Sequence, residues 1–111
     1  MATEKKAPSA EKRKATTSLP YVICRCKDAG VHAGELQGER DGRVTLLNAR
    51  RVWYWQGAAS LSEIAEKGAG ESSKIAVVVT RVDLRSDDVA EIIYCQKAGA
   101  DWLRGIKPWR A

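Results

Sequence analysis

The sequence has no long apolar run. Its longest, Ile75 to Val79, is far shorter than the roughly 20 residues that cross a bilayer, so we expect no membrane-spanning segment and no membrane partner. The charged start, MATEKKAPSAEKRK, is followed by no apolar stretch and therefore does not resemble a secretory signal. These absences predict a cytoplasmic protein.

Cysteine, histidine and catalytic motifs are also scarce. The three cysteines are an odd number, which argues against a disulfide framework. Cys24, Cys26, Cys95 and the single His32 formally make a Cys₃His set, but C-x-C is a less typical zinc spacing than C-x₂-C, so core packing is favoured over metal binding. No P-loop, GxSxG, HExxH or paired-carboxylate motif occurs, and nothing near His32 suggests a nucleophile. We therefore predict no metal, no cofactor, no catalytic residue and no enzyme activity.

Positive charge is concentrated at the N-terminus. The chain of 111 residues carries a net charge of +5. Residues 1–19 hold five basic and two acidic side chains, a net +3, which leaves +2 for the remainder. Because residues 1–19 offer almost nothing to bury, we predict a disordered basic tail there and a single domain over residues 20–111. Such a tail would support weak nucleic-acid binding, whereas the nearly balanced domain gives little electrostatic footprint.

Hydrophobic patterning predicts an α+β fold. The pair Asp41-Gly42 predicts a tight hairpin, and Ser60 followed by Glu63 predicts a capping box at a helix over residues 61–67. The continuous run from Ile75 is typical of a strand buried on both faces. Strands are expected at 21–26, 31–37, 43–48, 51–55, 75–84 and 89–95, with a second helix at 98–106. The predicted architecture is a small, mainly antiparallel, curled sheet or partial barrel of about six strands, with a short helix after the fourth strand and a C-terminal helix.

The segment ARRVWYWQGAAS suggests a ligand site. On a strand, Arg51, Trp53 and Trp55 share one face, where the indoles could stack on a planar ring and the guanidinium could bind phosphate. The small residues that follow lead into a helix N-terminus, a natural anion site. The alternative is that both tryptophans are core and the arginines are a solvated edge. The predicted ligand-binding residues are Arg50, Arg51, Trp53, Trp55, Gly57, Ala58, Ser60 and His32.

Three blocks carry a resemblance to a known family: GVHAGEL, VTLLNARRVWYWQGAASLSEIAEKG, and EIIYC before a helix with a tryptophan. Over about residues 20–106 the chain resembles small, largely uncharacterised proteins encoded by phages and prophages. The resemblance implies a viral accessory or morphogenetic protein in the cytoplasm of a bacterial host cell, and it implies no reaction. The lysine-rich leader and the Cys24-x-Cys26 pair lie outside the pattern. The shared residues are Gly30, Val31, His32, Gly34, Arg50, Arg51, Trp53, Trp55, Gly57, Ala58, Ser60, Leu61 and Glu63.

Taken together, these features predict a non-enzymatic phage or prophage accessory binding protein. Its partner would be a nucleotide-type small molecule, as in a protein that sequesters a host immune signal, or a host protein. One alternative is a nucleic-acid-binding module that uses the basic tail for phosphate contacts. Another is a virion or assembly component whose aromatic strand is a subunit interface. We also expect a homo-oligomer.

Overall fold

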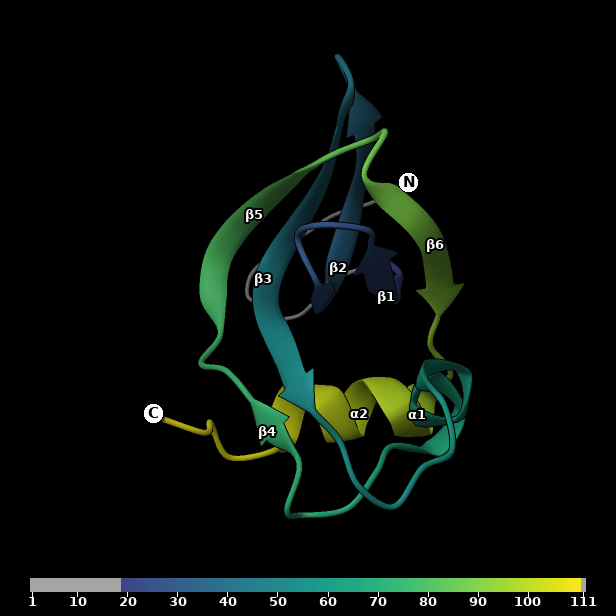
Figure 1. Cartoon of the computed structure of the whole chain (residues 1–111), viewed down its shortest axis with the longest axis vertical. Helices are drawn as coiled ribbons and strands as arrows, with labels where there is room; N and C mark the ends of the chain where they lie inside the picture. Colours follow the sequence, from purple (N-terminus) through teal and green to yellow (C-terminus); the bar gives the residue numbers. More distant parts are fainter. Residues whose placement is uncertain (1–18, 111) are drawn as a thin grey trace, which may run out of the picture.

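The chain forms one antiparallel sheet with two helices on one side (Figure 1). The computed structural model describes residues 19–110, so almost all of the predicted tail lies outside the described residues. The α+β class is confirmed. The elements in chain order are β1 (Tyr21–Cys26), β2 (Val31–Arg40), β3 (Arg43–Tyr54), α1 (Leu61–Lys67), β4 (Lys74–Ile75), β5 (Val79–Arg85), β6 (Val89–Tyr94) and α2 (Lys97–Gly105).

The strand order is β4-β3-β2-β1-β6, and β5 pairs with β3 beside β4. Strands β5 and β6 are joined by a turn at residues 86–88, yet β5 pairs with β3 and β6 pairs with β1. In Figure 1 they run down opposite sides of the molecule from that turn. Closure into a barrel would require the two edge strands to pair. The expectation of a curled sheet or partial barrel was therefore wrong, because the sheet is neither curled nor closed.

Strand β3 is one long strand where two were predicted. Asn48 adopts a left-handed conformation, with φ of 49°, and the β2–β3 register shifts by one residue beside it, which marks a β-bulge. The chain therefore bends at Asn48 without leaving the sheet, and the short helix follows the third strand. Gly34 lies opposite this bulge. A Cβ atom there would lie 3.0 Å from the Cα atom of Ala49, so the close approach of β2 and β3 requires glycine.

The apolar run after Lys74 does not form the predicted strand buried on both faces. Only Ile75 is buried, whereas Val77, Val78 and Val79 are 43 to 46% exposed. This segment lies along one side of β3 at the edge of the sheet. A continuous apolar run indicates double burial only for a strand with neighbours on both sides, which this segment lacks.

Two hydrophobic cores lie on opposite faces of the sheet, and the central strand β1 contributes to both. The helix-side core joins the sheet to α1 and α2 and contains Tyr21, Ile23, Ala33, Val52, Leu61, Ile64, Ala65, Ile75, Ala100 and Leu103. The second core contains Val22, Cys24, Cys26, Val44, Leu46, Ala49 and Leu84. Because alternate residues of β1 enter different cores, the strand is almost wholly buried.

The short helix has the predicted bounds. Ser60 caps it by accepting a hydrogen bond from the Glu63 backbone N–H at 3.2 Å. Helix α2 begins at Lys97, one residue before the predicted start, and buries Gly99, Ala100 and Leu103. No helix within residues 19–110 is long and apolar enough to span a membrane.

Gly99 sets the distance between the two helices. A methyl group on it would overlap the backbone carbonyls of Ile64 and Ala65 in α1. We expect Gly99→Ala to lower the free energy of unfolding by about 1 to 3 kcal/mol or more, because the packed helices must move apart to make room for the methyl group. Chemical denaturation measures this change.

Gly105→Ala is the matched control, since Gly105 lies in the same helix and faces open space. It should leave stability unchanged or raise it by up to about 1 kcal/mol through helix propensity. Equal stability of the two variants would contradict the proposed close contact.

Candidate functional site

The adjacent arginines of β3 occupy opposite sides of the sheet. Arg50 is 2% exposed and lies under the helices, whereas Arg51 is half-buried and its guanidinium lies 5.1 Å from the centre of the Trp53 ring. Strand alternation separates them, as it separates any consecutive pair. Only Arg51 can therefore contact an external ligand.

Arg50 is held by backbone carbonyls. Its Nε donates to the Ala76 carbonyl at 2.8 Å, and Nη1 donates to those of Leu103 at 2.7 Å and Ile106 at 3.0 Å. The last two lie at the C-terminal end of α2, where the helix dipole favours a cation. Burial lowers the pKa of the guanidinium, but arginine stays charged in proteins. Arg50 was predicted to bind a ligand, and the structure instead places it as a link between the sheet and α2.

His32 is also buried, although it is the register neighbour of Arg51. Its Nε2 donates to the Ala29 carbonyl at 2.9 Å, which anchors the loop between β1 and β2. The same loop is held by the Asp88 carboxylate, which accepts the backbone N–H of Ala29 at 2.9 Å. Burial lowers the pKa of His32, and the nearby Arg51 lowers it further. The imidazole therefore supports the loop in its neutral form at pH 7.

A second bulge determines where the aromatic side chains of β3 point. Val52 pairs with Ile75, and both pack in the helix-side core. Their neighbours Trp53 and Lys74 therefore point to the opposite face. The next residue of β3 to pair with β4 is Tyr54, which lies opposite Lys74. Two residues of β3 therefore oppose one residue of β4, and this bulge turns Tyr54 to the same face as Lys74.

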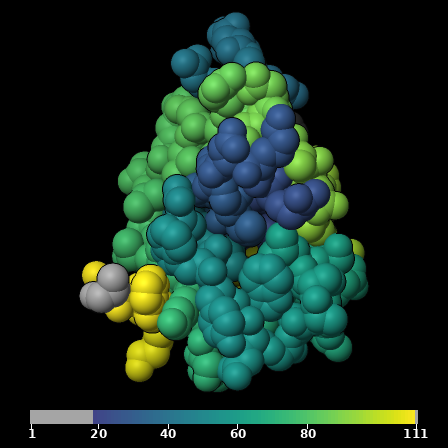
Figure 2. All heavy atoms as spheres, viewed as in Figure 1, coloured from purple at the N-terminus to yellow at the C-terminus, as the bar shows by residue number. Residues whose placement is uncertain are grey.

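These side chains form an exposed group that we call the aromatic surface: Arg51, Trp53, Tyr54, Lys74 and Trp109. Trp53 is 57% exposed, and the Lys74 ammonium lies 5.7 Å from the centre of the Tyr54 ring and 5.3 Å from that of Trp109. The Trp109 backbone N–H donates to the Ile75 carbonyl at 2.8 Å, which holds the C-terminal segment against β4. Figure 2 shows the end of β3 and the following segment, coloured teal, at the surface in the lower half of the view.

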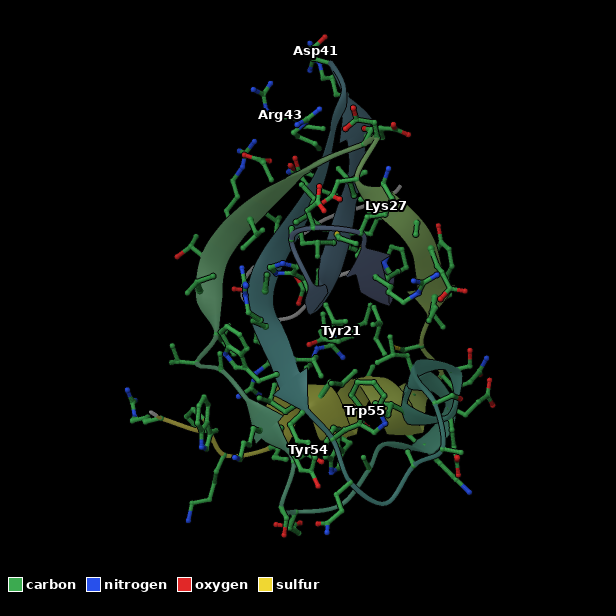
Figure 3. The ribbon with its side chains drawn as sticks, viewed as in Figure 1. Tyr21, Lys27, Asp41, Arg43, Tyr54 and Trp55 are labelled. Atoms are coloured by element: carbon green, nitrogen blue, oxygen red, sulfur yellow. The ribbon has the colours of Figure 1, made fainter. Side chains whose placement is uncertain are left out.

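The other predicted ligand residues do not join this surface. Trp55 and Ala58 pack against the helix-side core, and Figure 3 shows Trp55 beside the helices while Tyr54 lies at the lower end of β3. Gly57 has a φ of 85° and lies against Gly70 in the neighbouring loop. Core packing explains the positions of Trp55 and Ala58, and a turn of the chain explains that of Gly57.

The start of α1 is not open to an anion. The Ser60 hydroxyl accepts the N–H of Glu63, and the Glu63 carboxylate accepts that of Ala59 at 2.7 Å. The Ala59 N–H, with help from Lys67, lowers the pKa of Glu63, so the carboxylate is ionised at neutral pH. An incoming phosphate would meet this negative charge. The sequence signal at Ser60 is therefore explained by helix capping.

The cysteines are free thiols. Burial raises the pKa of Cys24 to about 12 and that of Cys95 to about 11, and it also raises the pKa of Cys26. Because the thiolate is the reactive and metal-binding form, all three are poor nucleophiles and poor ligands at neutral pH. Within residues 19–110, no group of three or more potential metal-binding side chains comes together.

Three members of the aromatic surface were missed by sequence reasoning. Lys74 and Trp109 come from segments far from β3 and carry no motif. Tyr54 lies in the WYW run, where simple alternation places it on the face opposite Trp53, because alternation does not include the bulge. The one feature of the sequence that could have indicated an exposed Tyr54 is the run of consecutive aromatic residues at the end of the strand.

The fold and these contacts define a small α+β protein with an open surface of aromatic rings and cations. A family described as "Domain of unknown function (DUF6948)" matches residues 19–103, and the chain belongs to this family. Comparison with curated proteins and with solved structures found no match. The family description states no phage origin, so that part of the resemblance stays a prediction.

The burial of His32 predicts a pH dependence of stability. The pKa of His32 in the folded protein is below the ordinary value of 6.5. At a pH between these two pKa values, His32 is protonated in the unfolded chain but neutral in the folded protein. The stability contributed by neutral His32 is therefore present above about pH 6.5 and is lost as the pH falls towards the folded-state pKa. Urea unfolding at pH 7.5 and pH 5 measures this loss.

His32→Gln is the matched variant, because its amide can still donate to the Ala29 carbonyl but does not titrate. The difference in unfolding free energy between the two pH values should be smaller in this variant. An equal difference in both proteins would show that His32 does not cause it.

Proposed function

We propose that this chain is a non-enzymatic binding protein that recognises a nucleotide-type ligand on its aromatic surface. The observation that carries the proposal is the exposed Trp53 ring with the Arg51 guanidinium against it. An indole offers a flat apolar face to a base, and a guanidinium offers paired donors to a phosphate. Both groups stand on one strand, which fixes their separation.

The shape of the surface favours a ligand with more than one base. Tyr54 and Trp109, with Lys74 between them, provide a second aromatic group on the same side of the sheet as Trp53. The rings are spread over an open face, which suits successive stacked bases better than a single enclosed nucleotide. Short single-stranded nucleic acid and multi-base nucleotide signals both have this chemistry.

The biological setting proposed here rests on the resemblance to phage and prophage proteins. In that setting the protein would act in the cytoplasm of a bacterial host and would sequester a nucleotide signal used in defence. A balanced domain suits this role, since its modest net charge of +2 over residues 20–111 limits unspecific binding to nucleic acid.

A host protein is a second candidate partner, favoured by a separate observation. Val77, Val78 and Val79 are exposed in succession after β4. Consecutive exposed apolar residues are unusual on a monomer surface and are typical of an interface.

Titration of the full chain with a short oligothymidylate and with a cyclic dinucleotide tests the proposal. We expect Trp53→Ala to weaken binding by about 1 to 3 kcal/mol through lost stacking. Arg51→Ala should weaken it by about 1.5 to 3 kcal/mol through lost charged hydrogen bonds. Neither change should unfold the protein, because both side chains lie at the surface.

Tyr94→Ala is the matched control, since Tyr94 is 59% exposed on β6 at the other edge of the sheet. Its affinity should equal that of the parent protein. The proposal is wrong if neither nucleotide probe binds, or if Trp53→Ala and Tyr94→Ala have equal effects.

A further inference from the structure

A separate small cavity lies between the sheet and the C-terminal end of α2. It has a volume of about 240 Å³ and is lined by Tyr21, Glu35, Asn48, Val78 and Arg104. These residues come from β1, β2, β3, the connection before β5, and α2. None belongs to the aromatic surface. Figure 3 shows Tyr21 in the interior of the molecule, above α2.

Two polar groups in this cavity have unused hydrogen-bonding capacity. Glu35 is 9% exposed, and its Oε1 accepts from Asn48 Nδ2 at 3.2 Å. Its Oε2 lies 3.8 Å from Arg104 Nη2, which is too long for a hydrogen bond. Tyr21 is 5% exposed, and its hydroxyl makes no hydrogen bond to any other residue between 19 and 110. These two oxygen atoms can therefore form hydrogen bonds with a ligand in the cavity.

The cation of the cavity is paired with Glu35 by charge, without a hydrogen bond. The Arg104 guanidinium stacks 4.6 Å from the centre of the Tyr21 ring and makes no hydrogen bond within the described part of the chain. Its N–H groups can therefore donate to a carboxylate in the paired geometry that arginine favours. Stacking on Tyr21 fixes the plane of the guanidinium before any ligand arrives.

The bulge at Asn48 places the fourth polar group of the cavity, the Asn48 side chain. Asn48 is left-handed at this bulge, and its side-chain NH₂ faces Glu35, which leaves the amide oxygen free for a donor. A non-glycine residue with positive φ is uncommon, and such positions concentrate at ligand sites. Burial raises the pKa of the Tyr21 hydroxyl, so it stays protonated and can donate as well as accept.

We propose that this cavity binds a small zwitterion of the amino-acid class, with its carboxylate on Arg104 and its ammonium on Glu35. The Tyr21 hydroxyl and the Asn48 amide oxygen complete the set of partners, and Val78 contacts an apolar side chain.

Charge and size select this class. The cavity holds one anion and one cation, so a simple anion would be repelled by Glu35 and a simple cation by Arg104. Glu35 and Arg104 pair with each other only at 3.8 Å, and a ligand with both charges can replace this long ion pair with a direct hydrogen bond to each residue. Drug-sized ligands occupy cavities of about 300 to 1,000 Å³, so a volume of 240 Å³ suits a smaller molecule.

Calorimetric titration of the full chain with each of the common amino acids tests this proposal. We expect at least one free amino acid to bind, while its N-acetyl form and its carboxamide form bind much more weakly. Arg104→Gln and Glu35→Gln should each weaken binding by about tenfold or more, as expected when a charged hydrogen bond is lost. Both variants keep side chains of similar reach, and circular dichroism checks that they fold.

Arg85→Gln is the control, since Arg85 is exposed on β5 and pairs with Asp87 away from the cavity. It should bind like the parent protein. The proposal is overturned if no free amino acid binds, if the N-acetyl and carboxamide forms bind as well as the free one, or if the Arg104 and Glu35 variants bind normally. Nucleotide binding by the same samples is read separately, so failure here is distinguishable from failure of the aromatic surface.

Discussion

The buried guanidinium of Arg50 joins the sheet to the helices. It donates to three carbonyls, one after β4 and two at the end of α2. No carboxylate within residues 19–110 pairs with it, so the backbone carbonyls alone stabilise its charge. Each hydrogen bond to a charged group contributes about 1.5 to 3 kcal/mol, and loss of the guanidinium would leave three acceptors without their donor. Arg50 thus ties the segment after β4 and the end of α2 to β3, and residues of both candidate sites lie on these elements.

Two bulges in β3 turn a regular strand into a scaffold for binding groups. The first, at Asn48, brings a left-handed residue to Glu35 and forms one wall of the small cavity. The second, at Trp53, places two consecutive aromatic residues on the face away from the helices. Bulges commonly redirect side chains near functional sites, and here each one serves a different surface. The strand between them carries Arg50 and is fixed by packing on both faces.

Local signals in the sequence predicted local structure well. The Asp41-Gly42 turn has positive φ at both residues, and Ser60 caps the short helix as expected. These features depend on neighbours within four residues, which a sequence displays directly.

Features that depend on distant segments could not be predicted in this way. Alternation separated Arg50 from Arg51 but gave no indication of which face the helices cover. The exposure of Val77 to Val79 follows from a place at the sheet edge, and the open sheet follows from where β5 and β6 pair. The cavity unites Tyr21, Glu35 and Arg104 across most of the chain, so no spacing in the sequence points to it.

A division of roles between two consecutive arginines underlies the proposed binding: Arg50 is structural, and Arg51 contacts the ligand. Nuclear magnetic resonance of the arginine Nε–H groups, recorded with and without a short oligothymidylate, tests it most directly. We expect a slowly exchanging Arg50 signal that does not move and a rapidly exchanging Arg51 signal that shifts on addition of the oligonucleotide. A fast-exchanging Arg50 signal that shifts, beside an unchanged Arg51 signal, would contradict it.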